Sequence, residues 1–301
     1  MRYRRLGRTD LEVSVIGVGT WQYGGEWAKD FTVEEVDAIL GRAQELGVNL
    51  IDTAECYGDH LSESLIGRAI GSTRDDWVIA TKFGHRYHGH HRRTDEWSPA
   101  EVVRQLEGSL RALQTDYVDL YQFHSGDDEA FDQDELWEAL AAQLVAGKFR
   151  HLAISLGSAG NLHQVRQAVE VGASVIQVVY SRLDTEPEAE VLPWCQNHGL
   201  GVLAREALAG GLLAGRYRAG HRFDDPADTR SARPAEETER RLLEVERLRR
   251  EEVPEGVPAA SWALAWCLAH PAVTAVLPGC KSVEQLEAGV GAADVQVVRG
   301  G

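Results

Sequence analysis

Short, β-rich apolar runs alternate with longer helical patterns along the whole chain, and this alternation constrains the fold most. Most of the runs are continuously apolar, as expected for parallel strands that are covered on both faces. Eight alternations predict an α/β fold, a single (β/α)8 TIM barrel domain over residues 1–301, rather than a doubly wound sheet. The eight runs are VIGVGT (15–20), VNLID (48–52), WVIATK (77–82), YVDLYQFH (117–124), HLAIS (151–155), VIQVVY (175–180), LGVLAR (200–205) and AVLPG (275–279).

The helical segments between these runs carry recognisable start signals. Thr32 and Glu35 predict a capping box, and the stretch 98–101 supplies a cap, a first-turn proline and an acid. Leucines at helical spacing over 136–144 indicate a further helix.

Two segments fall outside the strand–helix rhythm. Residues 3–16 predict an N-terminal hairpin, which we expect to cover the bottom of the barrel. Residues 218–256 are rich in Arg, Asp and Glu and predict an insertion after strand seven, with an exposed helix near 235–252.

Charge and cysteine content limit the possible partners and the compartment. The net charge of −16 argues against a nucleic-acid surface and against binding to an anionic membrane, and no apolar run is long enough to span one. The four cysteines are far apart and form no CxxC pair, which is typical of a reducing compartment. We therefore expect a cytoplasmic protein that acts on a small molecule, and we leave monomer or homo-oligomer open.

Polar side chains stand where three neighbouring strands end. Asp52 ends the second strand, Lys82 the third and His124 the fourth, and Tyr57 follows in the loop after the second. In a (β/α)8 barrel the strand ends meet at one mouth, where catalytic groups lie. We therefore predict that these four side chains converge.

These four residues suit the reduction of a carbonyl group. An ordinary tyrosine has a pKa of about 10, so it donates a proton poorly near neutral pH. A nearby Lys82 ammonium favours the phenolate and lowers that pKa, and Asp52 would hold the lysine in place. With His124 to orient the oxygen, the set fits delivery of a hydride to carbon and of a proton to oxygen.

Several motifs together resemble the aldo-keto reductase family over nearly the whole chain. They are GVGTWQYGG (17–25), IDTAECYG (51–58), ATKFG (80–84), LRALQTDYVDLYQFH (110–124) and GLLAGRY (211–217). The resemblance implies that Asp52, Tyr57, Lys82 and His124 form a catalytic tetrad. It also implies an oxidoreductase that reduces aldehydes or ketones reversibly, with NADPH, or less often NADH, extended across the barrel mouth.

The same resemblance implies which residues hold the cofactor and the substrate. Leu156, Ala288 and Gly289 depart from the family pattern, the first at a carboxamide ligand and the others at the adenine. Substrate contacts are implied for Trp21, Tyr57, His124 and Tyr87. Cofactor contacts are implied for Thr20, Trp21, Asp52, Ser155, Gln177, Arg205, Leu208, Gly210, Gly211, Leu213, Gly279, Lys281, Ser282 and Gln285.

Two of these positions have physical reasons of their own. Ser282 and Gln285 predict a helix start beside Lys281, which makes a good anion site, and the family places the 2′-phosphate of NADP there. Arg205 stands where relatives often have an aromatic residue, and its flat guanidinium would stack on the nicotinamide ring.

Alternative functions remain open at this point. Some relatives bind NADPH tightly as regulatory subunits of ion channels, so a redox sensor with little turnover is the second hypothesis. A Schiff-base aldolase with Lys82 as nucleophile is a third. The histidines within 85–91 favour a basic loop over a metal site, because no carboxylate or cysteine stands at a convincing spacing, and we assign no metal.

Overall fold

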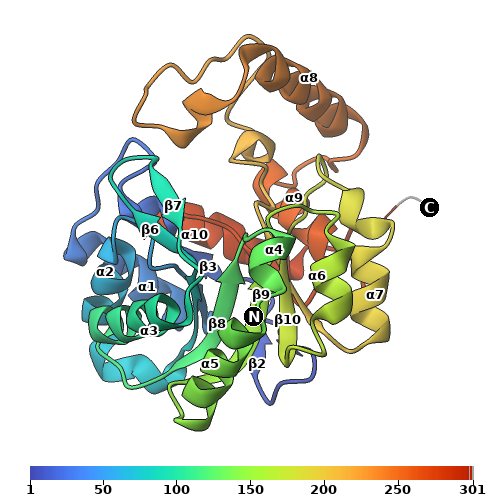
Figure 1. The fold of residues 1–301 in the computed structure, drawn as a ribbon. Helices are drawn as coiled ribbons and strands as arrows, with labels where there is room; N and C mark the ends of the chain where they lie inside the picture. Colours follow the sequence, from blue (N-terminus) through green and yellow to red (C-terminus); the bar gives the residue numbers. More distant parts are fainter. Residues whose placement is uncertain (298, 300–301) are drawn as a thin grey trace.

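Eight parallel strands close into a barrel in the computed structural model of the protein, which describes residues 1–297 and 299 (Figure 1). The barrel closes between its first and last strands, where the amides of Gly17 and Gly19 donate to the carbonyls of Val276 and Pro278 at 2.9 and 3.0 Å. The predicted fold class is confirmed. In barrel order the strands are β3 (Val18–Gly19), β4 (Leu50–Asp52), β5 (Val78–Phe83), β8 (Val118–His124), β9 (Phe149–Ser155), β10 (Ala173–Val179), β11 (Gly201–Arg205) and β12 (Ala275–Leu277).

Helices surround the strands and pack their apolar faces on them. The Thr32–Glu35 capping box forms as predicted, whereas Ser98 stands at its helix start without a side-chain cap bond. Leu136 and Leu140 are buried, but Leu144 is exposed. The helices are α1 (Val33–Glu45), α2 (Leu61–Ile70), α3 (Pro99–Leu113), α4 (Asp128–Phe131), α5 (Asp134–Val145), α6 (Leu162–Gln167), α7 (Val191–Asn197), α9 (Ala259–Leu268) and α10 (Val283–Val290).

The N-terminal hairpin fills one end of the barrel, as predicted. It pairs β1 (Tyr3–Arg5) with β2 (Glu12–Ser14) in antiparallel register. Leu6, Leu11 and Val13 are buried in a cluster with apolar residues of β4, β5 and β8 to β12. Because these strands start at that end, the opposite mouth is left for polar groups.

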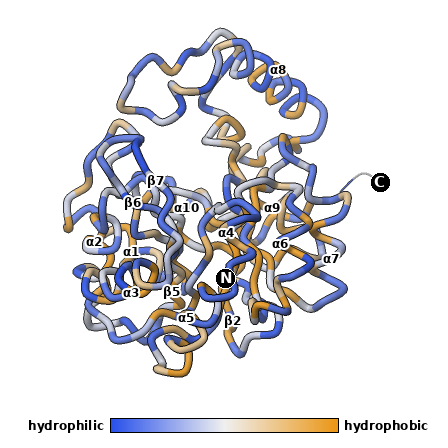
Figure 2. The backbone as a smooth tube through the Cα atoms, viewed as in Figure 1, coloured by the Kyte–Doolittle hydropathy of each residue, from blue (hydrophilic) through white to orange (hydrophobic). Residues whose placement is uncertain are grey.

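The insertion after β11 carries α8 (Ala235–Glu251), close to the predicted bounds. Figure 1 shows α8 arching away from the strand ends, and Figure 2 shows hydrophilic and hydrophobic residues mixed along it. Leu242, Val245 and Leu248 are buried, so the helix is amphipathic and anchored rather than solvated on all sides. Within the described residues, no helix is long and apolar enough to cross a membrane.

Candidate active site

The inward-facing positions of the strands change from apolar to polar toward the mouth of the barrel. In β4, Leu50 lies in the apolar cluster below, and Asp52, two residues on, lies above it. The same step occurs from Ala80 to Lys82 in β5. Side chains in a strand alternate between faces, so residues two apart point into the same interior. This pattern builds a polar layer on top of an apolar plug.

Lys82 connects two other members of the predicted tetrad, Asp52 and Tyr57. Its Nζ donates to Oδ1 of Asp52 at 2.7 Å, to the carbonyl of Thr53 at 2.7 Å and to the Tyr57 hydroxyl oxygen at 3.1 Å. The lysine side chain is 1% exposed and that of Asp52 is 7% exposed. The end of β4, at Asp52, and the loop that follows it, at Thr53 and Tyr57, thus supply three acceptors to a single ammonium from β5.

Asp52 is held on its other side by two amides. Nε2 of Gln122 donates to Oδ2 of Asp52 at 2.9 Å, and Nε2 of Gln177 donates to the same oxygen at 2.7 Å. Ser155 in turn donates from Oγ to Oε1 of Gln177 at 3.2 Å. Gln122 is absent from our sequence prediction. A glutamine inside the apolar strand β8 needs a buried partner, and that signal would have found it.

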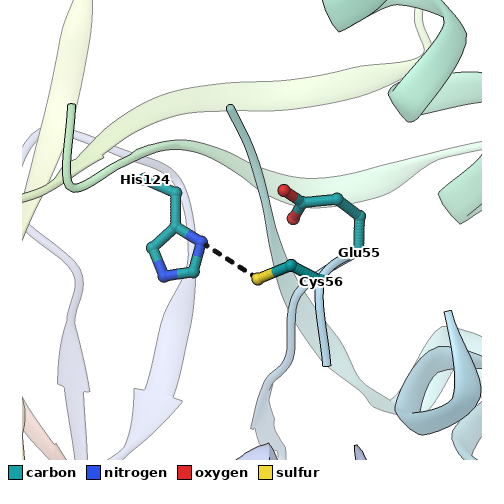
Figure 3. Close-up of side chains that lie close together, drawn as sticks. All are labelled: Glu55, Cys56 and His124. Atoms are coloured by element: carbon teal, nitrogen blue, oxygen red, sulfur yellow. Dashed lines mark hydrogen bonds between the residues drawn. The ribbon is translucent and has the colours of Figure 1, made fainter. Parts of the chain in front are cut away.

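His124 completes the group beside the Tyr57 ring, which it meets edge-on at 6.1 Å between ring centroids. Its Nδ1 lies 3.7 Å from the Cys56 sulfur, and Figure 3 shows the other ring nitrogen pointing away from that sulfur. Burial and the neighbouring His85 hold the pKa of His124 well below its ordinary value. The imidazole is therefore neutral and offers one N–H as a donor.

Burial decides the acidity of Tyr57 in this structure. It raises the pKa of the phenol to about 12, although Lys82 acts in the opposite direction. The lowered pKa that we predicted for Tyr57 from the lysine alone is therefore wrong. For Lys82, burial alone would lower the pKa, but Asp52 and Tyr57 outweigh it and raise the pKa. Both groups therefore stay protonated near neutral pH.

A cavity of about 660 Å³ extends from this group across the barrel mouth. Five predicted residues do not line it: Lys82, Ser155, Leu213, Ser282 and Tyr87. Tyr87, in the hairpin of β6 (His85–Tyr87) and β7 (Arg93–Asp95), lines a separate cavity of about 470 Å³. The predicted residues that do line the main cavity are Thr20, Trp21, Asp52, Tyr57, His124, Gln177, Arg205, Leu208, Gly210, Gly211, Gly279, Lys281 and Gln285.

The middle and far end of the cavity suit an extended anionic molecule. Gly210 and Gly211 have φ of 68° and 87°, a left-handed conformation that favours glycine and leaves their backbone open to a ligand. At the start of α10, Ser282 Oγ accepts from the Gln285 amide at 3.3 Å. The Lys281 ammonium, whose one hydrogen-bond partner among the described residues is the Trp27 carbonyl, lies beside this helix start. The residues present thus fit a dinucleotide phosphate.

Arg205 lies on the cavity wall at the end of β11. Its guanidinium donates to Oε1 of Glu206 at 2.8 Å and to the Leu156 carbonyl at 3.0 Å, and its Nε has no hydrogen-bond partner among the described residues. The Leu156 side chain is apolar and buried in the core, so it offers no side-chain amide to a ligand.

The insertion supplies cavity residues that the sequence did not reveal. Arg230 donates to the Gly210 carbonyl at 3.2 Å and to the Tyr217 hydroxyl at 3.1 Å. Asp228 holds this arginine through Nε at 2.9 Å, and Trp27 pairs with Asp228 in an isolated bridge. Only folding brings these loops together, so no local sequence signal marks them.

Glu55, Cys56 and His124 form a cluster of possible metal ligands (Figure 3). One ligand atom from each lies within 4.8 Å of the others, and it is the only such cluster found among the described residues. Burial raises the pKa of the Cys56 thiol, which works against metal binding because the thiolate is the ligand. We keep the prediction that the site holds no metal.

Comparison with known proteins identifies the family of this chain. The model of the Aldo/keto reductase family matches residues 15–299. The chain belongs to this family. The oxidoreductase YrpG of Bacillus subtilis is 34% identical over 311 residues, which cover 99% of this chain and 92% of YrpG. A probable voltage-gated potassium channel subunit beta of Oryza sativa is 30% identical over 314 residues, 98% of this chain and 92% of that protein.

Among solved structures, the aldo-keto reductase AKR11C1 from Bacillus halodurans in its holo form superposes with a TM-score of 0.82 at 32% identity. The alignment covers 99% of this chain and 93% of that one. Aldo-keto reductases are oxidoreductases that use nicotinamide cofactors, and the cavity described above has a cationic end, at Lys281, that suits the phosphates of such a cofactor.

Proposed function

We propose that this aldo-keto reductase reduces aldehydes or ketones to alcohols with NADPH, reversibly, and accepts NADH less well. The observation that carries the proposal is the contact between Tyr57 and Lys82 at one end of a cavity whose other end holds Lys281. An acid beside a carbonyl site and a cation beside a helix start are the two features that such a reaction needs.

In this mechanism Tyr57 donates the proton. NADPH supplies the hydride when it is bound. As negative charge develops on the substrate oxygen, the Tyr57 O–H bond breaks and the proton passes to that oxygen. Lys82 then stabilises the phenolate from 3.1 Å, and Asp52 keeps the lysine in place. The neutral His124 donates a hydrogen bond to the same oxygen and fixes its direction.

The cofactor contacts divide along the cavity. Lys281 and the first turn of α10 would bind the 2′-phosphate, and this supports NADPH over NADH. Gly210 and Gly211 would approach the pyrophosphate with their backbone. Gln177 and Arg205 would meet the nicotinamide end, while Leu156, a buried apolar residue, leaves one amide contact unmade.

A second candidate is a cofactor-binding regulatory subunit with little turnover. The resemblance to the rice channel subunit supports it, since the two chains align over nearly their whole length. The aldolase hypothesis loses support, because the raised pKa of Lys82 keeps its amine protonated and unable to attack a carbonyl.

The test is NADPH oxidation with a broad panel of aldehydes and ketones, for the wild type and Tyr57→Phe. We expect turnover in the wild type and its loss in the variant, with NADPH binding unchanged when followed by fluorescence. Tight binding without turnover in the wild type would favour the regulatory subunit. A Tyr57→Phe variant that keeps most of its rate would refute the assignment of the proton donor.

A further inference from the structure

Glu26, in the loop after β3, is a fully buried carboxylate that ties three segments together. Its Oε2 accepts from Nε1 of Trp21 at 2.9 Å and from the guanidinium of Arg93 in β7. Its Oε1 accepts from the His91 amide at 2.8 Å, and its own carbonyl accepts from the amide of Thr229 in the insertion at 3.2 Å. The hairpin and the insertion are thereby fixed to the loop after β3.

The two side-chain partners of Glu26 line the active-site cavity, although Glu26 itself does not. The Trp21 ring lies nearly parallel to the Tyr57 ring, with 6.1 Å between centroids and 23° between planes. Its edge meets Trp27 at 5.2 Å. Arg93 also donates to the Cys56 carbonyl at 3.2 Å, so its charge lies next to the tetrad loop. Glu26 therefore holds the Trp21 ring in the cavity wall and neutralises the Arg93 guanidinium, both of which lie close to the tetrad.

Among the described residues, each arginine that lines this end of the cavity is matched by a carboxylate. Arg205 pairs with Glu206 at 2.8 Å, and Arg93 pairs with Glu26. Lys82 is buried and does not line the cavity, and it pairs with Asp52 at 2.7 Å. Burial lowers the pKa of His85 and of His124, so both imidazoles are neutral. The substrate end thus presents aromatic rings without a free positive charge.

The opposite end of the same cavity differs. Arg216 and Lys281 line it, and within the described part of the chain neither forms an ion pair with a carboxylate. Glu284 lines this end too. Unpaired cations thus gather at the cofactor end, where we place a phosphate, and are absent among the described residues of the substrate end.

We propose that Glu26 determines the substrate class. By neutralising Arg93 and holding Trp21 against Tyr57, it makes the site select uncharged carbonyl compounds with an aromatic or apolar group and reject those that carry a carboxylate. Aromatic side chains in the cavity wall favour the binding of apolar and aromatic groups. A carboxylate would lose its hydration there without gaining a free cation in return. The inference rests on the proposed reductase function, and Glu26 is a positioning residue that acts through Arg93 and Trp21.

The kinetic test compares benzaldehyde with 4-carboxybenzaldehyde, each with NADPH. The wild type should have the higher kcat/KM for benzaldehyde. Glu26→Gln keeps the shape but uncovers the Arg93 charge, so the ratio should shift about tenfold toward the carboxylated aldehyde. The double variant Glu26→Gln/Arg93→Met should return to the wild-type ratio. Glu101→Gln, which removes an acid that pairs with Arg86 and Arg104 outside this cavity, should leave the ratio unchanged.

A binding test without cofactor separates this inference from the reductase proposal. Quenching of tryptophan fluorescence should show benzamide bound more tightly than benzoate by the wild type, with a shift of about tenfold toward benzoate in Glu26→Gln. Arg93→Met leaves Glu26 uncompensated and should shift the preference the other way, which a general loss of folding would not do. Wild-type protein that prefers benzoate, or variants with the wild-type preference, would overturn the inference even if carbonyl reduction is confirmed. Absent turnover with the expected binding shifts would contradict only the reductase proposal.

Discussion

The ammonium of Lys82 lies 3.1 Å from the Tyr57 hydroxyl oxygen, although the two residues stand 25 positions apart in the chain. This contact links the acid of the proposed reaction to a buried ion pair with Asp52. The proposed catalysis and the folding stability therefore involve the same three side chains, and variants of them must be designed to separate the two effects.

Replacing Lys82 with methionine should damage both properties. Breaking a buried ion pair leaves Asp52 uncompensated, which we expect to lower the free energy of unfolding by about 3–5 kcal/mol. The loss of phenolate stabilisation should lower kcat/KM by about 10²–10⁴-fold. The double variant Asp52→Asn/Lys82→Met should recover most of the stability but none of the activity. Urea denaturation and steady-state kinetics check both, and recovered activity would contradict the role of the lysine.

Replacing Lys281 with alanine should weaken NADPH binding selectively. Hydrogen bonds to charged groups contribute about 1.5–3 kcal/mol, so KM for NADPH should rise tenfold or more while KM for NADH changes little. Lys29, which donates to the Lys281 carbonyl at 3.1 Å and pairs with Glu35, provides the matched control. Lys29→Ala should leave both values near those of the wild type. An equal rise for both cofactors in Lys281→Ala would argue against a 2′-phosphate site.

Glu55 should make the stability of the protein depend on pH. Burial raises the pKa of this carboxyl to about 8, and its Oε2 has no hydrogen-bond partner among the described residues. The unfolded chain releases this proton near pH 4.5, while the folded chain retains it to about pH 8. The contribution of Glu55 is therefore most favourable below pH 4.5 and declines by at most ~1.4 kcal/mol per pH unit up to about 8.

The variant Glu55→Gln isolates this effect, because its amide does not titrate. Its free energy of unfolding should rise relative to the wild type as the pH increases from 5 to 8. Denaturant titrations of both proteins at a series of pH values give the difference directly. A difference that stays constant over this range would show that Glu55 is ionised in the folded protein.

Gly7 should be important for folding stability, because it lies where the N-terminal hairpin approaches the backbone of β11. Its φ is +57°, and an added Cβ would lie 2.1 Å from the Gly201 backbone nitrogen. Gly7→Ala should therefore lower the free energy of unfolding by at least ~2 kcal/mol, through both the left-handed backbone and the overlap. Gly220 also has a left-handed φ of +84°, but an added Cβ there would meet no atom of the described residues within 4 Å. Gly220→Ala should therefore cost only the left-handed backbone conformation. Equal losses in the two variants would show that the close approach to Gly201 relaxes.

Much of the fold could be predicted from the local sequence, because the hydrophobic pattern along the chain indicates which segments form strands and helices. Continuous apolar runs predict buried parallel strands, and an Asp or Lys two residues after an inward apolar residue predicts the polar layer at the mouth. Gln122 was not predicted. A glutamine in an apolar strand needs a buried hydrogen-bond partner, but the sequence does not show which residue that partner is. The tertiary structure shows that Gln122 and Gln177 both donate to Oδ2 of Asp52.

The pKa of Tyr57 is one property that the sequence did not predict. A nearby lysine is predictable from strand order, but the degree of burial is not, and burial has the larger effect on this phenol. Tyr87 gives a second example. It lies close in sequence to the tetrad strands, yet it belongs to the β6–β7 hairpin and lines a separate cavity.

By itself, the amino-acid sequence determined the closed barrel and the set of polar residues at its mouth, because hydrophobic periodicity and strand ends are local properties. Only the tertiary structure decided how Glu26 joins Trp21, Arg93 and the insertion, because those contacts connect loops that no pattern in the chain relates. The charge and shape of the substrate end depend on that long-range packing.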